Sequence, residues 1–192
     1  ELIRTKLGFR EEAVAVATEI RSPLLLRVVC ETLSIEQDAI REKVLTDYCT
    51  CVIGAKTSPV SEMTSSYRSL LGRLTRSEFG DVVLPALTRS LRRNPEVVLP
   101  LAESLFREMH LDVSAFGVEL LKVLLQFIRH TNPTVQVAAV DVQLNVAKLI
   151  SDRDILQQMV HMLDGVLSGK LEGRIKSIQE RIALAKALGV LS

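Results

Sequence analysis

The chain has 192 residues, of which 47% are hydrophobic and only 4% aromatic, so it is long enough to bury a large core of mainly aliphatic side chains. Its 24 basic and 23 acidic residues nearly balance, and a net charge of +1 excludes any inference of a nucleic-acid partner from charge alone. Three cysteines without a CxxC pattern exclude a disulfide framework and favour a reduced, intracellular protein. The most apolar stretch, residues 120–128, is too short and too often interrupted to cross a membrane, so we expect no membrane partner.

Proline marks a repeat along the chain. Four of the six prolines recur at intervals of about 36 to 38 residues, within or just short of the range of HEAT units. They are Pro23, Pro59, Pro95 and Pro133. Each follows Ser or Asn, and such a cap followed by proline favours a helix start, because proline lacks the N–H that would stay unpaired there. We expect each proline to begin the second helix of a pair, and one further step reaches the turn 169–173.

The first helix of each pair needs a start of its own. Residues 34–37 and 75–78 fit the capping-box pattern, Asp112 is suited to cap the next helix, and Ser151 or Asp152 the one after. The predicted order is an incomplete pair over 1–34, then pairs at about 35–74, 75–110, 111–150 and 151–191. Pro85 and Pro100 lie inside predicted helices and should kink or locally break them.

These elements predict an all-α fold, a HEAT-type α-solenoid of stacked antiparallel helix pairs in a single array over residues 1–192. One pair cannot bury its apolar face alone, whereas stacked pairs form a continuous core. The last predicted helix ends on the apolar residues Ala187, Leu188, Val190 and Leu191. We therefore expect the chain to be a fragment of a longer solenoid, in which a further pair covers that end.

The chain has three histidines, His110, His130 and His161, and none of them belongs to a catalytic or metal-binding motif. The segment 165–171 is similar to a phosphate-binding loop, but it lacks the final Ser or Thr and follows a helix, which favours a turn between helices. Cys49 and Cys51 alternate on a helix and point apart, so they indicate core packing and not a redox pair. We therefore expect a binding scaffold without enzymatic activity, cofactor, metal or small-molecule substrate.

Basic residues occupy one recurring position, just before each predicted turn within a pair. In a solenoid these turns line up along one edge. The residues of this basic edge are Arg21, Lys56, Arg93, Arg129 and Lys170, with Arg89 and Arg92 adding to its middle. Such an edge can bind phosphates or acidic protein, but the same residues also offset helix dipoles in any protein, and both interpretations stay open. The lack of interleaved aromatic residues argues against binding of single-stranded nucleic acid.

Two sets of residues resemble known families. The segment 133–139, followed by Leu144 and Ala147, resembles the second helix of a HEAT repeat. From about Leu45 onward, a series of short motifs is similar in order and spacing to the N-terminal region of the general amino-acid control translational activators. The motifs are Ser77-Glu78-Phe79, Leu84-Pro85, Asn94-Pro95-Glu96, Leu111-Asp112-Val113-Ser114, Asn132-Pro133 and Gly169-Lys170-Leu171.

That family consists of very large HEAT-repeat proteins that ride on ribosomes and activate the kinase of translation initiation factor 2. The resemblance implies a cytoplasmic scaffold on translating or collided ribosomes, active in the response to amino-acid starvation. It also implies that other regions of the protein contact the kinase, so that this segment contributes ribosome association and solenoid length. Two alternatives stay open. One is a HEAT scaffold for another cargo, as in nuclear transport or chromosome-associated proteins, and the other is an α-helical enzyme whose site needs residues outside the chain.

Overall fold

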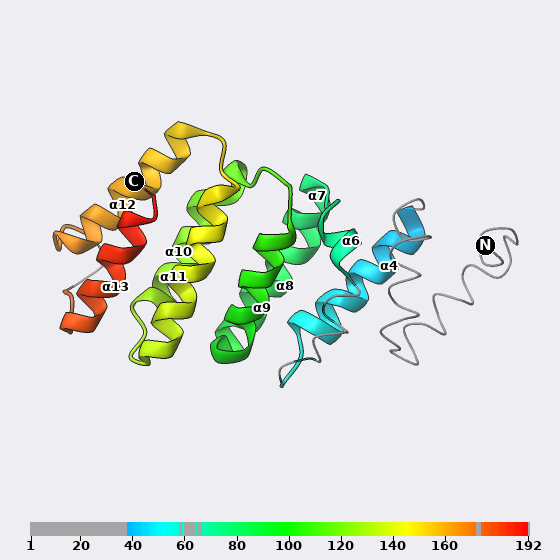
Figure 1. Cartoon of the computed structure of the whole chain (residues 1–192), viewed down its shortest axis with the longest axis horizontal. Coiled ribbons are helices and arrows are strands. Elements are labelled where there is room, and N and C mark those ends of the chain that lie inside the picture. The colour runs from blue at the N-terminus through cyan, green and yellow to red at the C-terminus, as the bar shows by residue number, and fades with distance from the viewer. Residues whose placement is uncertain (1–37, 58, 60–63, 65–66, 172–173, 192) are drawn as a thin grey trace, which may run out of the picture. The chain divides into compact units, whose positions relative to one another are not determined.

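The structure, a computed structural model, describes residues 38–57, 59, 64, 67–171 and 174–191, and every regular element in these residues is helical (Figure 1). The chain forms two compact units. The first contains the described residues up to Ser90 together with Glu108–Leu111, and the second contains Leu91–Arg107 and the described residues from Asp112 onward. The predicted all-α fold of HEAT-type helix pairs is confirmed, while the single array over 1–192 and its pair boundaries stay a prediction.

The first unit is built around two buried tyrosines. Its elements are α4 (Asp38–Tyr48), the π-helical segment η1 (Cys49–Ile53), α6 (Arg68–Leu71), α7 (Arg76–Glu78), the π-helical segment η2 (Phe79–Val83) and α8 (Leu84–Arg93), whose last residues belong to the second unit. The rings of Tyr48 and Tyr67 lie 5.1 Å apart, inclined by 55°. The Tyr67 hydroxyl donates to Asp47 Oδ2 at 2.5 Å, so this polar group has a partner although the residue is fully buried.

Two prolines inside helices have different consequences. Pro85 has no N–H to donate to the carbonyl of Asp81, and the preceding residues Phe79–Val83 take up a wider π-helical turn. The break predicted at Pro85 is therefore a local change of pitch in a helical run that continues to Arg93. Pro100 lies inside α9 (Pro95–Glu108), and this helix continues through it without a break.

The second unit contains stacked helix pairs. Besides α9 it contains the short 3-10 turn η3 (Ser114–Phe116), α10 (Gly117–Ile128), α11 (Pro133–Lys148), α12 (Arg153–Leu167) and α13 (Ile178–Gly189). Helix α10 packs against α11 and α12 against α13, and the two pairs stack through contacts of α11 with α13 and of α10 with α12 (Figure 1). Fully buried aliphatic side chains such as Leu121, Val146 and Leu184 fill the interior of this unit.

The predicted cap residues explain why these helices begin where they do. Asn132 caps α11, because its side-chain oxygen accepts a hydrogen bond from the Thr134 N–H at 2.9 Å. Asp152 caps α12, and Thr75 forms the predicted capping box with Glu78 at the start of α7. These starts are confirmed, as is the start of α9 at a proline. Those predicted at Pro23, Ser34 and Ser58 lie outside the described residues.

The last helix begins later than the proline repeat predicts. Its N-cap is Ser177, whose hydroxyl accepts from the Glu180 N–H at 3.0 Å. The residues near Leu171 instead close the end of α12, since the N–H groups of Lys170 and Leu171 donate to the Gly165 carbonyl at 2.8 and 2.9 Å. Gly169 has φ of 74°, a conformation that glycine adopts without strain. The segment 165–171 is therefore the predicted turn between helices.

Asp112 joins two helix starts. Its carboxylate accepts from the Ser114 N–H and hydroxyl at 2.9 and 2.5 Å and from the Ser151 hydroxyl at 2.6 Å. The hydrogen bond from the Ser114 hydroxyl is the main reason that the pKa of Asp112 is lowered to about 2. Asp112 lies one residue before Val113, the N-cap of η3, and α10 begins after Phe116 without a side-chain cap, so the prediction that Asp112 caps the next helix is not confirmed. The carboxylate instead links the turn at Ser114 to the residue before the α12 cap.

Candidate partner-binding surfaces

The basic edge predicted from the sequence contains two kinds of residue. Five of its side chains are exposed: Lys56, Arg89, Arg92, Arg93 and Lys170. Arg129 is largely buried, with 16% of its side chain exposed, and Arg21 lies outside the described residues. The position of Arg129 therefore needs a separate explanation.

Arg129 binds within the fold. Its Nε donates to Glu180 Oε1 at 2.5 Å, and one terminal nitrogen reaches the Arg174 carbonyl at 3.5 Å. Burial alone raises the pKa of Glu180, but hydrogen bonds from the Lys176 N–H and from Arg129 more than offset this and hold it below its ordinary value. The charge of Arg129 is therefore compensated by α13, and the residue fastens the end of α10 to the start of α13.

Three arginines form one exposed face at the end of α8, called here the α8 arginine face. Arg89, Arg92 and Arg93 are spaced i, i+3 and i+4, so they lie on neighbouring turns of the same side of the helix. Arg92 and Arg93 occupy the last turn, where positive charge offsets the helix dipole. Three guanidinium groups at this spacing also provide several donors for phosphate or carboxylate oxygens.

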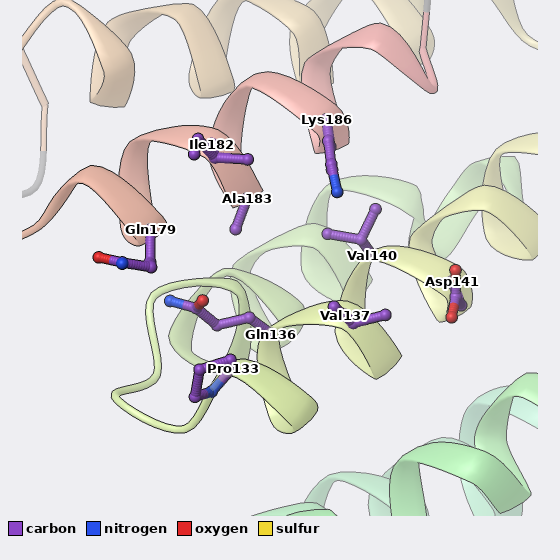
Figure 2. A pocket seen from close by; sticks show the side chains of 9 residues that line it. All are labelled: Pro133, Gln136, Val137, Val140, Asp141, Gln179, Ile182, Ala183 and Lys186. Atoms are coloured by element: carbon purple, nitrogen blue, oxygen red, sulfur yellow. The ribbon is translucent and has the colours of Figure 1, made fainter.

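An apolar groove runs between α11 and α13. It is lined by Pro133, Gln136, Val137, Val140, Asp141, Gln179, Ile182, Ala183 and Lys186 (Figure 2). Val137 and Ile182 are 56% and 49% exposed, and Ile178, at the start of α13, is 75% exposed. In Figure 2, Lys186 points from α13 toward Val140 of α11. This groove was not predicted from the sequence, although apolar residues of α11 and α13 outside the buried stripe indicate an exposed apolar surface.

A second, more polar hollow lies between α9 and α11. Glu103 and Arg107 of α9 face it and form an ion pair with an N–O distance of 3.0 Å. Asn145 of α11 donates to the same glutamate at 3.1 Å. The charges of this hollow are thus largely paired with one another, in contrast to the apolar groove.

The remaining candidates lack reactive chemistry. Burial raises the pKa of the Cys49 thiol to about 11, so this sulfur stays protonated at neutral pH and is a poor nucleophile. Within the described residues, no group of His, Cys, Asp and Glu side chains could hold a metal ion. No helix among those residues is long and apolar enough to span a bilayer.

Comparisons with known proteins point to one family. Residues 41–175 match the family model of the N-terminal region of the stalled ribosome sensor GCN1. Protein ILITYHIA of Arabidopsis thaliana is 30% identical over 145 residues, which are 76% of this chain and 5% of that protein. The stalled ribosome sensor GCN1 is 28% identical in Homo sapiens over 145 residues, 76% of this chain and 5% of that protein. The Mus musculus sensor is 28% identical over 160 residues, 82% of this chain and 6% of that protein.

The chain thus spans only 5 to 6% of the length of these relatives. No solved structure matches it. The family match nevertheless covers more than half of the chain and includes the α8 arginine face and all of α11 and α12. The chain therefore belongs to the family of GCN1 N-terminal regions.

Proposed function

We propose that the chain is a non-catalytic HEAT-repeat segment of a longer, cytoplasmic translational activator that associates with ribosomes. The observation that carries this proposal is the family match over residues 41–175. The human and mouse relatives are named stalled ribosome sensors, which supports a role on the ribosome. Stacked helix pairs expose side chains on two faces and are suited to holding one large partner against another.

The α8 arginine face is the part of the basic edge that we propose as a ribosome contact. Arg89, Arg92 and Arg93 are all exposed, and their guanidinium groups suit the phosphates of ribosomal RNA and the carboxylates of acidic ribosomal proteins. Lys56 and Lys170 are exposed members of the same proposed edge. Arg129 contributes packing instead, because Glu180 compensates its charge.

Charge reversal tests the contact in a full-length protein that carries this segment. The variant Arg89→Glu/Arg92→Glu/Arg93→Glu should reduce co-sedimentation with ribosomes by about tenfold at physiological salt, because phosphate contacts contribute strongly to such affinities. The matched control is Lys122→Glu/Arg153→Glu/Arg181→Glu, which makes the same change of net charge at exposed residues of three other helices. It should sediment like the wild type.

The competing account is that these arginines only offset the α8 dipole. In that case the triple variant loses only about 0.3–1 kcal/mol of stability per dipole-facing charge and still sediments with ribosomes. Far-ultraviolet circular dichroism establishes that each variant is folded. Unchanged co-sedimentation of a folded triple variant would contradict the ribosome contact and would mean that the three arginines only offset the α8 dipole.

The proposal assigns kinase activation to the longer protein and not to this segment. We expect the full-length protein to promote activation of the initiation factor 2 alpha kinase through regions outside the 192 residues. A pull-down of the kinase regulatory domain by the isolated chain should therefore recover no more kinase than a tag-only control. Retention of the kinase at micromolar concentrations would overturn this division of roles.

A further inference from the structure

The outward-facing residues of α9, α11 and α13 differ sharply in chemistry. Four positions spaced i, i+4, i+7 and i+11 describe one side of each helix. In α9 they are Glu96, Pro100, Glu103 and Arg107; in α11 they are Pro133, Val137, Val140 and Leu144; in α13 they are Ile178, Ile182, Ala185 and Gly189. All of them are at least partly exposed except Val140, which is buried. Charged groups therefore cover α9, whereas α11 and α13 each present an apolar stripe, of which Pro133, Val137, Val140 and Ile182 line the groove.

Burial within the described residues does not account for these stripes. Val137, Leu144, Ile178 and Ile182 are 38% to 75% exposed, although the opposite side of each helix is packed into the core. Aliphatic side chains gain free energy when they leave water, so a cluster of them on a surface marks a binding site. The groove as a whole has a volume of about 200 Å³, which is enough for one large apolar side chain.

The charges beside the groove indicate the sign of the charge that a partner carries there. Helix α13 carries three charged residues, and its single acid, Glu180, is buried against Arg129. The exposed charges of α13 are therefore both positive, Arg181 and Lys186, and Lys186 lines the groove itself. One exposed acid of α11, Asp141, also lines the groove, so the exposed charges of α13 and of the groove are two cations and one acid.

We propose that the groove between α11 and α13 binds an amphipathic α-helix of a protein partner, with aliphatic residues facing the groove and an acidic residue facing Lys186. The apolar residues of α11 that line the groove, Pro133, Val137 and Val140, span about two helical turns, which matches anchors spaced i, i+4 and i+7 on a bound helix. This inference goes beyond ribosome association and uses a surface separate from the α8 arginine face, so each can fail without the other.

A displayed library of helical peptides of about 15 residues, long enough for three anchors, provides the probe. Selection on the 192-residue chain should enrich peptides with aliphatic residues at i, i+4 and i+7 and an adjacent Asp or Glu. Recovery of peptides without this pattern, or of none that bind, would overturn the proposal.

Variants of the chain test whether the selected peptide binds in the groove. Ile182→Glu should weaken its binding by at least about tenfold, because the apolar contact is lost and an acid is added. Gln158→Glu, at an exposed site on α12, makes the same change of charge and should leave binding unchanged. Lys186→Glu should weaken the binding of acidic peptides by about fivefold and strengthen the binding of versions in which Lys replaces the acidic residue. Equal binding by Ile182→Glu and the wild type would contradict the proposed site.

Two other occupants are distinguished by the same variants. If the groove bound a second copy, the chain would form dimers in analytical ultracentrifugation that Ile182→Glu abolishes. If it bound lipid, vesicles containing phosphatidylserine would retain the wild-type chain and lose the Ile182→Glu variant. Either result would overturn the proposal of a partner helix, and neither is expected, since the polar side chains of Asp141 and Gln179 also line the groove.

Discussion

Each of the two compact units contains an ion pair between an arginine and a glutamate that fixes the start of a helix, and the two ion pairs differ in burial. In the first unit, Arg41 Nε donates to Glu78 Oε1 at 2.5 Å, and Arg41 also donates to the Arg73 carbonyl. In the second, Arg129 makes the same bond to Glu180 at 2.5 Å and reaches the Arg174 carbonyl. Both glutamates follow a cap residue by three positions, so each ion pair joins an earlier helix to a capped helix start.

The two pairs differ in which partner is more buried. The Glu180 side chain is 5% exposed and that of Glu78 is 20% exposed, whereas Arg129 is 16% exposed and Arg41 10%. Glu78 is also held by Thr75 through the capping box, whereas Glu180 accepts the Lys176 N–H from outside its helix. A charge left without its partner costs less where another acceptor remains, and Arg41 keeps the Arg73 carbonyl, whereas Arg129 has only a 3.5 Å contact with the Arg174 carbonyl. The comparison teaches that the second unit depends more on its ion pair than the first.

Removing the acid of each pair is the strongest test. Glu180→Ala should lower the free energy of unfolding by about 3 kcal/mol, because Arg129 is left buried without its partner. Glu78→Ala should cost about 2 kcal/mol, because Arg41 keeps its hydrogen bond to the Arg73 carbonyl. Urea denaturation of both variants measures the order, with exposed Glu119→Ala as the control. Equal losses at the two sites would show that the remaining carbonyl acceptor does not set the cost.

Replacing both partners sharpens the same comparison. In Arg129→Met/Glu180→Met no charge is left buried, so the double variant should recover about 2 kcal/mol of the loss caused by Glu180→Ala. The double variant Arg41→Met/Glu78→Met should recover less, about 1 kcal/mol, because its single variants lose less. Denaturation of single and double variants gives the coupling energy of each pair. A double variant as unstable as Glu180→Ala would mean that packing, and not charge, is lost.

Only the helix cap next to each ion pair is predictable from the sequence. The capping box at 75–78 was predicted because its residues are close in the chain. The bond from Arg41 to Glu78 was not, because it spans 37 residues and depends on how helices pack. Arg129 was read as part of a basic edge for the same reason, since its partner lies 51 residues away.

The repeat predicted some helix starts and misplaced one. Asn132 and Asp152 carry their cap chemistry in local sequence, and the structure confirms both. Ser177 and Glu180 show the same Ser-x-x-Glu pattern as 75–78, but extrapolation from the proline spacing favoured an earlier start. The apolar groove needed more than local sequence, because it depends on which side of α11 and α13 stays uncovered after packing.

Acidification should weaken both ion pairs. The pKa values of Glu78 and Glu180 are held below their ordinary value, even though burial alone raises them, by hydrogen bonds that include those from Arg41 and Arg129. Their stabilising contribution is therefore fully present above the unfolded pKa of about 4.3 and is lost as pH falls through the lower folded pKa. The effect should be smaller than that of Glu180→Ala, because a protonated carboxyl still forms hydrogen bonds.

Urea denaturation between about pH 6 and pH 3, across the unfolded carboxyl pKa, measures this loss. Glu180→Gln should lose less stability over that range than the wild type, because one titrating group is removed. Asp112, with its pKa near 2, is present in both proteins and should contribute equally. Parallel profiles would contradict the lowered pKa of Glu180.

The smallest expected effect separates capping from ion pairing in the first unit. The Thr75 hydroxyl accepts from the Glu78 N–H at 3.3 Å and donates to Glu78 Oε2 at 3.0 Å, while the Thr75 N–H donates to the same oxygen at 2.8 Å. Thr75→Ala removes the two hydroxyl bonds to Glu78 and a 3.3 Å hydroxyl contact with Ser77, and it keeps the N–H bond, so it should cost about 1 kcal/mol. Arg41 still holds the glutamate in this variant, which keeps the loss below that of Glu78→Ala. Ser77→Ala removes only the 3.3 Å contact with Thr75, at an exposed position, and should cost less than about 0.5 kcal/mol. A loss at Thr75 as large as that of Glu78→Ala would mean that the cap, and not Arg41, positions the carboxylate.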